Sequence, residues 1–159
     1  MKRIIFTLLA GTAILVQLSV HGQDIPLNKF DQRGIEVINS FMTALVDNQT
    51  DEMAAAKSAL SFIHGSEYDN SGANLKRYRL DFSFKKAWQN AKFYKLPVSV
   101  TRIQRQNLTA IGFGATAQAG TGFKAWIAKK DGVAGMPAPL NIFFPSDGSA
   151  PKLNYYGSL

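Results

Sequence analysis

The spacing of apolar residues changes once along the chain, near residue 98. Before that point apolar residues recur at intervals of three and four, which is the spacing of one buried helix face. This pattern predicts three helices, over residues 30–47, 50–64 and 75–94. Thr50 is the expected N-cap of the second helix, and His64-Gly65 is its expected end.

After residue 98 the apolar period becomes two, which is typical of half-buried strands. Alternating segments begin near residues 98, 123, 140 and 152, and Ser146-Asp147-Gly148-Ser149 is a turn signal. Residues 131–139 are expected to connect two adjacent strands. Helices followed by antiparallel strands indicate an α+β fold with about three helices and a sheet of four to five strands.

The first residues predict export. Lys2 and Arg3 precede an uncharged apolar run from residue 4 to residue 20, and Gly22 stands where a signal peptidase would cut. We therefore expect a signal peptide over residues 1–22 and a single domain over residues 23–159, which is periplasmic or secreted and of bacterial type. An uncleaved membrane anchor is the alternative, and after cleavage no membrane contact is expected. The absence of cysteine excludes thiol catalysis and thiolate metal sites.

Charge is unevenly distributed along the expected domain. Residues 23–75 carry three basic and eight acidic side chains, whereas residues 76–130 carry twelve basic side chains and one acid, Asp81. Basic stripes can bind nucleic acid, but export argues against a nucleic-acid partner. Three interpretations of the basic segment remain open. It could form a solvated face, attract anionic cell-surface polymers, or pair with the acidic first third of the domain.

The element order and the closing pattern TGFKAWIAKKDG, PAPLNIFFPSDG and PKLNYYGSL resemble the nuclear transport factor two-like superfamily, the cystatin-related cone fold. The resemblance covers nearly all of residues 23–159. It implies helices packed on a curved, cone-like sheet, with a pocket between the long helix and the sheet. Members include isomerases, dehydratases, hydrolases, ligand binders and association domains that often dimerise through the sheet, so the fold alone does not choose a function.

Two titratable residues are weak catalytic candidates. His64 precedes Glu67 and Asp69 and could act as a general base, or its imidazole could complement a helix C-terminus. Asp81 could abstract a proton, as carboxylates do in isomerase members of the resembled family, or it could pair with Arg77 or Lys85 four residues away. No metal site and no cofactor are expected.

Aromatic residues are the candidates for ligand contacts. Trp126 alternates with the apolar residues of its strand and is expected on the sheet face that carries Lys124, away from the core. The Lys129 side chain could be a polar group in the wall of a binding pocket. The residues expected to bind a ligand are Tyr78, Trp88, Trp126, Phe143 and Tyr155.

These observations predict an exported, non-catalytic domain that binds a small molecule, a peptide or an envelope partner. The alternatives are a cofactor-independent enzyme that uses Asp81 or His64 as acid or base, and a homodimer formed through the sheet face of Trp126.

Overall fold

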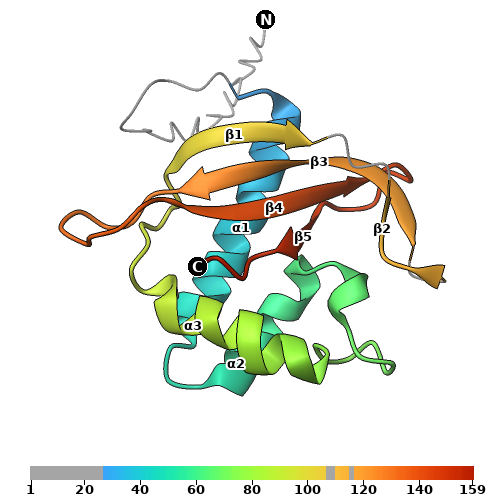
Figure 1. Cartoon of the computed structure of the whole chain (residues 1–159), viewed down its shortest axis with the longest axis horizontal. Helices are drawn as coiled ribbons and strands as arrows, with labels where there is room; N and C mark the ends of the chain where they lie inside the picture. Colours follow the sequence, from blue (N-terminus) through green and yellow to red (C-terminus); the bar gives the residue numbers. More distant parts are fainter. Residues whose placement is uncertain (1–26, 107–109, 115–116) are drawn as a thin grey trace, which may run out of the picture.

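The computed structural model describes residues 27–106, 110–114 and 117–159. The expected signal peptide, residues 1–22, lies outside the described residues. The described chain has the α+β fold that the sequence pattern predicts, with helices first and a five-stranded antiparallel sheet after them (Figure 1).

The first two helices begin at side-chain caps. Helix α1 spans Lys29–Asp47, and the side chain of Asn28 and that of Asp31 form a reciprocal capping box at its start. Helix α2 spans Glu52–Ala59, and its N-cap is Asp51 rather than Thr50, because the Asp51 carboxylate accepts from the second and third backbone amides that follow it.

Helix α2 does not reach His64-Gly65, so the predicted end of this helix is wrong. A 3₁₀ turn, η1 (Leu60–Phe62), follows α2, and the backbone of Ile63 is already extended. A second 3₁₀ turn, η2 (Gly65–Glu67), begins at His64. His64 therefore precedes a new turn instead of closing the old helix.

The third predicted helix consists of a π-helical segment, η3 (Arg79–Phe84), and helix α3 (Lys85–Ala91). Helix α3 ends at Ala91, three residues before the helix end predicted at Tyr94. The side chain of Trp88 in α3 donates from Nε1 to the Asn48 carbonyl at 2.9 Å, and Gln49 Nε2 donates to the Trp88 carbonyl at 2.7 Å. These bonds tie α3 to the loop between α1 and α2.

The strands are β1 (Val100–Gln106), β2 (Ala110–Ile111), β3 (Gln118–Ile127), β4 (Ala138–Pro145) and β5 (Lys152–Tyr155). Their order in the sheet is β1-β3-β4-β5, and β2 pairs with β3. Residues 128–137 connect β3 to β4, so the connection lies slightly earlier than predicted and Pro139 belongs to a strand. The turn predicted at residues 146–149 is confirmed between β4 and β5.

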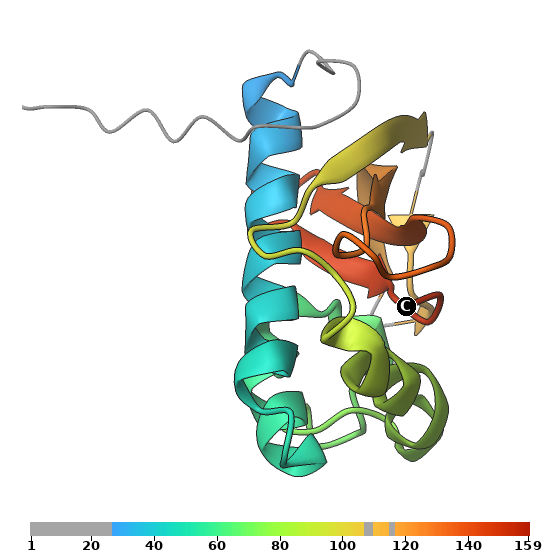
Figure 2. The same ribbon diagram turned by 90° about the vertical axis from the view of Figure 1, so that its left-hand side faces the viewer.

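Helix α1 lies along one face of the sheet, while α2 and α3 lie beyond one end of it (Figure 2). The sheet face towards α1 carries Phe123, Ala125 and Ile127, all fully buried. Gly34 of α1 lies so close to Phe123 that the ring fills the space a side chain would need. The interface between α1 and the sheet is therefore packed with side chains, and the hollows described below lie elsewhere.

Candidate functional site

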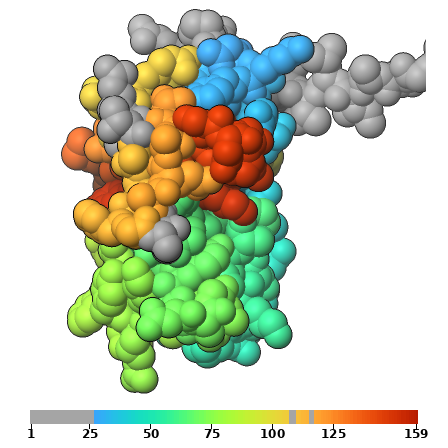
Figure 3. Space-filling model, turned by 90° about the vertical axis from the view of Figure 1, so that its right-hand side faces the viewer, coloured from blue at the N-terminus to red at the C-terminus, as the bar shows by residue number. Residues whose placement is uncertain are grey.

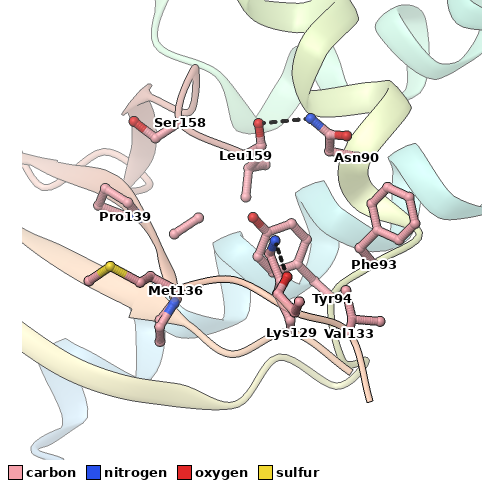
Figure 4. A pocket seen from close by; sticks show the side chains of 12 residues that line it. Asn90, Phe93, Tyr94, Lys129, Val133, Met136, Pro139, Ser158 and Leu159 are labelled. Atoms are coloured by element: carbon pink, nitrogen blue, oxygen red, sulfur yellow. Dashed lines mark hydrogen bonds between the residues drawn. The ribbon is translucent and has the colours of Figure 1, made fainter. Parts of the chain in front are cut away.

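A pocket of about 520 Å³ lies between the end of α3, the β3–β4 connection and the last residues of the chain (Figure 4). We call it the α3 pocket. Its lining is Asn90, Phe93, Tyr94, Lys129, Val133, Ala134, Met136, Pro137, Ala138, Pro139, Ser158 and Leu159.

Backbone hydrogen bonds hold the two sides of the α3 pocket together. The amide of Lys130 donates to the Phe93 carbonyl at 2.8 Å, and the amide of Lys95 donates to the Ala128 carbonyl at 3.3 Å. Tyr94 and Lys129 pair as an isolated antiparallel bridge between these two bonds. The segment after α3 thus acts as a short strand, which places Tyr94 and Lys129 in the same wall.

The hydroxyl of Tyr94 is the free polar group of this wall. The residue is 3% exposed, and its hydroxyl forms no hydrogen bond within the described part of the chain. Figure 4 shows the hydroxyl pointing into the pocket. Burial raises the pKa of Tyr94, so the group stays neutral and can donate a hydrogen bond to a ligand.

Lys129 brings a positive charge to the same pocket. Its Nζ donates to the Ala134 carbonyl at 2.9 Å and makes no ion pair with any described carboxylate. Gly135 adopts a φ of +113°, and a Cβ there would lie 2.5 Å from Lys129 Nζ, so glycine lets the loop close around the ammonium group. One of the three Lys129 protons is used by Ala134, and the others remain available to a ligand.

Most of the other side chains that line the α3 pocket are apolar. Met136 is 85% exposed and Phe93 is 38% exposed, so both present apolar surface at the rim. Asn90 Nδ2 donates to the Leu159 carbonyl at 3.1 Å, which holds the last residues against α3. An apolar wall with a few converging polar groups is the usual composition of a small-molecule site.

The sheet face opposite α1 carries the predicted aromatic residue Trp126. It is partly exposed and lies on the same face as Lys124, as the alternation predicts. The guanidinium carbon of Arg102 lies 4.5 Å from the Trp126 ring centroid, and Lys124 Nζ lies 5.7 Å from it. Tyr155, at 43% exposure, lies further along this face and shares a hydrogen bond with Ser158.

Phe143 does not share an exposed surface with Trp126. Its side chain is fully buried, and its ring meets the His64 ring edge-on at 5.4 Å between centroids. Gly120 makes room for it, because a Cβ at Gly120 would lie 2.5 Å from the Phe143 ring. A ligand on the exposed part of the face therefore cannot contact Phe143 unless side chains move.

His64 is buried and lies in a hydrogen-bond network that extends to the surface. Its Nδ1 accepts from the Ser66 amide at 3.1 Å and lies 2.9 Å from Ser66 Oγ, while its Nε2 lies 3.1 Å from Gln118 Oε1. Gln118 Nε2 donates to Asp147 at 2.8 Å, so its oxygen faces the imidazole and the ring proton sits on Nε2. Burial lowers the pKa of His64 more than the Gln118 hydrogen bond raises it, and the nearby Lys152 lowers it further.

The predicted role of His64 at a helix C-terminus is wrong. The imidazole is neutral and caps the start of η2, where an acceptor is needed instead of a cation. A hollow of about 610 Å³ with a mixed polar and apolar lining borders it, and Figure 3 shows this side of the molecule, where the segments near residues 65, 118 and 147 meet.

Asp81 lies in an exposed ion pair. Arg77 Nε is 3.1 Å from its carboxylate, with side-chain exposures of 90% and 48%, which confirms the predicted pairing with Arg77. The predicted alternative partner, Lys85, lies 3.9 Å from Glu52 instead.

Two other predicted binding residues lie away from these surfaces. Tyr78 is 52% exposed and borders neither the α3 pocket nor the face of Trp126. Trp88 forms the hydrogen bonds described above between α3 and the loop that joins α1 to α2.

Lys129 is a predicted pocket residue, whereas Tyr94 and Met136 are not among the residues predicted to bind a ligand. The sequence feature that indicates a pocket here is the connection between β3 and β4, which is longer than a tight hairpin needs.

No protein-family model, no curated protein and no solved structure matches this chain. Among the described residues, no helix is long and apolar enough to span a membrane, and no cluster of three or more acidic or histidine side chains could hold a metal ion.

Proposed function

We propose that this protein is an exported, non-catalytic binding domain whose ligand occupies the α3 pocket. The ligand is a small molecule with an apolar body and one anionic or strongly accepting end. The apolar body packs between Phe93, Met136 and Leu159, and the accepting end lies at Tyr94 and Lys129. The resemblance to the nuclear transport factor two-like superfamily, which includes ligand binders, is compatible with this proposal.

The observation that carries the proposal is the Tyr94 hydroxyl, which points into the α3 pocket and has no hydrogen-bond partner within the described part of the chain. Among the described residues, this hydroxyl is not one of the fully enclosed polar atoms that lack a partner, so it opens onto the pocket and can donate to a ligand. A ligand oxygen at this position would accept that hydrogen bond. Lys129 beside it adds a charge-assisted donor, which favours a carboxylate over a neutral carbonyl.

Octanoate and indole-3-acetate are suitable probes, because each joins an apolar body to one carboxylate. We expect line broadening and shift changes of the ligand protons in NMR, and weaker effects with the neutral analogues octanamide and indole-3-acetamide. Tyr94→Phe removes only the hydroxyl, and Lys129→Met removes the charge while keeping the chain length. Each substitution is expected to weaken carboxylate binding about tenfold.

Tyr78→Phe and Lys124→Met are the matched controls, since Tyr78 is exposed and does not line the α3 pocket, and Lys124 lies on the sheet face outside the pocket lining. Equal weakening by control and pocket variants would contradict the proposal. Unchanged binding in both pocket variants would also contradict it.

Acid–base catalysis at His64 is the second candidate function. It is favoured by the neutral imidazole, which faces Ser66 Oγ at 2.9 Å beside a hollow. It is disfavoured by the backbone amide of Ser66, which already occupies the same Nδ1 lone pair. Hydrolysis of p-nitrophenyl acetate that disappears in both His64→Asn and Ser66→Ala would favour this function over simple binding.

A further inference from the structure

Strand β1 forms one border of the sheet. It pairs with β3 on one side, in regular register from Arg102 to Gln106, and no other described strand pairs with its outer side. The strand can be followed along the upper border of the sheet in Figure 1. Backbone amides and carbonyls along such an edge are available to another extended chain.

The same strand carries a positioned cation. Arg102 stacks on the Trp126 ring, and its guanidinium makes no hydrogen bond or ion pair within the described part of the chain. Lys124 approaches the same ring and also lacks a carboxylate partner there. Stacking on an aromatic face restricts the guanidinium before any partner arrives, so less entropy is lost when its N–H groups bind a carboxylate.

The other arginine of the strand provides an internal comparison. Arg105 projects from the opposite face, where its Nη2 lies 2.8 Å from the buried carboxylate of Asp31 in α1. Arg105 is therefore already neutralised. Of the two cations of β1, Arg102 alone is free to meet an acid from outside.

We propose that β1 is a docking edge for an acidic, extended segment of a partner protein, which adds to the sheet as an additional antiparallel or parallel strand. The partner's backbone bonds to the outer side of β1, and its acidic side chains lie beside Arg102, with Lys124 one strand further into the sheet on the same face. Cross-strand pairs of opposite charge stabilise such an addition. Gln104, two residues after Arg102 on the same face and opposite Lys124, supplies a further hydrogen-bonding side chain.

A second copy of this chain does not fit the edge equally well. Pairing β1 with β1 would bring two strands together that contain arginine but no acidic residue. Like charges directly opposite each other destabilise a strand pair. Charge complementarity therefore favours an acidic partner.

The probe is a fluorescein-labelled eight-residue peptide that alternates Glu and Thr, measured by fluorescence anisotropy. An alternating Lys and Thr peptide tests charge, and an alternating Glu and Pro peptide keeps the charge but lacks the proline amides. We expect the Glu–Thr peptide to bind at least tenfold more tightly than either control. Arg102→Gln is expected to weaken it about tenfold, whereas Arg33→Gln, an exposed cation of α1, leaves it unchanged.

Hydrogen exchange separates strand addition from simple charge attraction. Slower exchange of the β1 amides in the presence of the Glu–Thr peptide supports the proposal. Unchanged β1 exchange, equal binding of the Glu–Pro peptide, or equal effects of Arg102→Gln and Arg33→Gln would overturn it. If polygalacturonate displaced the labelled Glu–Thr peptide more strongly than the unlabelled peptide does, the proposal would also be overturned, in favour of an acidic polysaccharide as the partner. Formation of a dimer that protects β1 without peptide would overturn it in favour of a second copy.

Discussion

Gly34 of α1 and Phe123 of β3 set the distance between the long helix and the sheet. A Cβ built at Gly34 would lie 2.5 Å from the Cζ atom of Phe123 and 3.0 Å from the ring of Phe144. The Phe123 ring is fully buried and packs at 5.7 Å from the Phe144 ring, measured between centroids. The absence of a side chain at residue 34 is therefore what lets these rings lie against the helix.

Gly34→Ala is expected to lower the free energy of unfolding by about 1–3 kcal/mol, because an added methyl group overpacks the interface. Helix propensity acts in the opposite direction, by about 1 kcal/mol in favour of alanine. Urea denaturation followed by circular dichroism measures the balance. Gly65→Ala is the control, since no atom lies within 4 Å of its added Cβ. A more stable Gly34→Ala protein would show that the rings shift at little cost.

Tyr156→Phe is expected to stabilise the protein by about 1 kcal/mol, because it removes a buried hydroxyl that has no hydrogen-bond partner. The ring itself packs against Phe41 and Phe84 and is retained in the variant. Burial and the nearby Glu67 raise the pKa of Tyr156, so the hydroxyl is neutral at all ordinary pH values. Chemical denaturation provides the measurement, with Tyr155→Phe as an exposed control. A loss of stability in Tyr156→Phe would mean that the hydroxyl has a partner in solution.

His64→Asn is expected to flatten the pH dependence of stability below neutral pH. The pKa of His64 in the folded protein is below its ordinary value of 6.5, so the unfolded chain takes up the proton first. The contribution of His64 is complete above pH 6.5 and is lost as the pH falls from there towards the folded pKa. Asparagine can still accept from the Ser66 amide as an N-cap, but it does not titrate.

The measurement for His64→Asn is the free energy of unfolding between pH 5 and pH 8. Burial raises the pKa of Glu67 above 4.5, so its contribution has the opposite slope and falls as pH rises from that value. Both proteins keep Glu67, so the difference between their curves isolates His64. Parallel curves would refute the lowered pKa.

Asp81→Asn is expected to change the free energy of unfolding by no more than about 0.5 kcal/mol, because its ion pair with Arg77 is exposed and screened by water. The midpoint of thermal unfolding, measured at low and at high salt, checks this expectation. Glu67→Gln provides the contrast, because Glu67 is 7% exposed and pairs with Arg79. A cost for Asp81→Asn as large as that for Glu67→Gln would indicate a role beyond the surface pair.

The apolar periods determined the fold class and the position of most elements. The first helix, the direction of Trp126 away from the core and the turn after β4 follow from local spacing, because burial on one face imposes a fixed period on helices and strands. The cone shape and the membership in the nuclear transport factor two-like superfamily remain predictions, as does export.

Tertiary structure alone decided where the polar groups act. His64 is neutral because burial disfavours the charged imidazole, and Gln118, distant in sequence, accepts its Nε2 proton, which leaves Nδ1 free to cap the Ser66 amide. Tyr94 and Lys129 share a pocket wall because backbone hydrogen bonds join the segment after α3 to the segment after β3. Phe143 is buried rather than exposed because His64 covers the same face that Trp126 leaves partly open. A sequence period specifies which face a side chain occupies, but what covers that face depends on contacts between segments far apart in the chain.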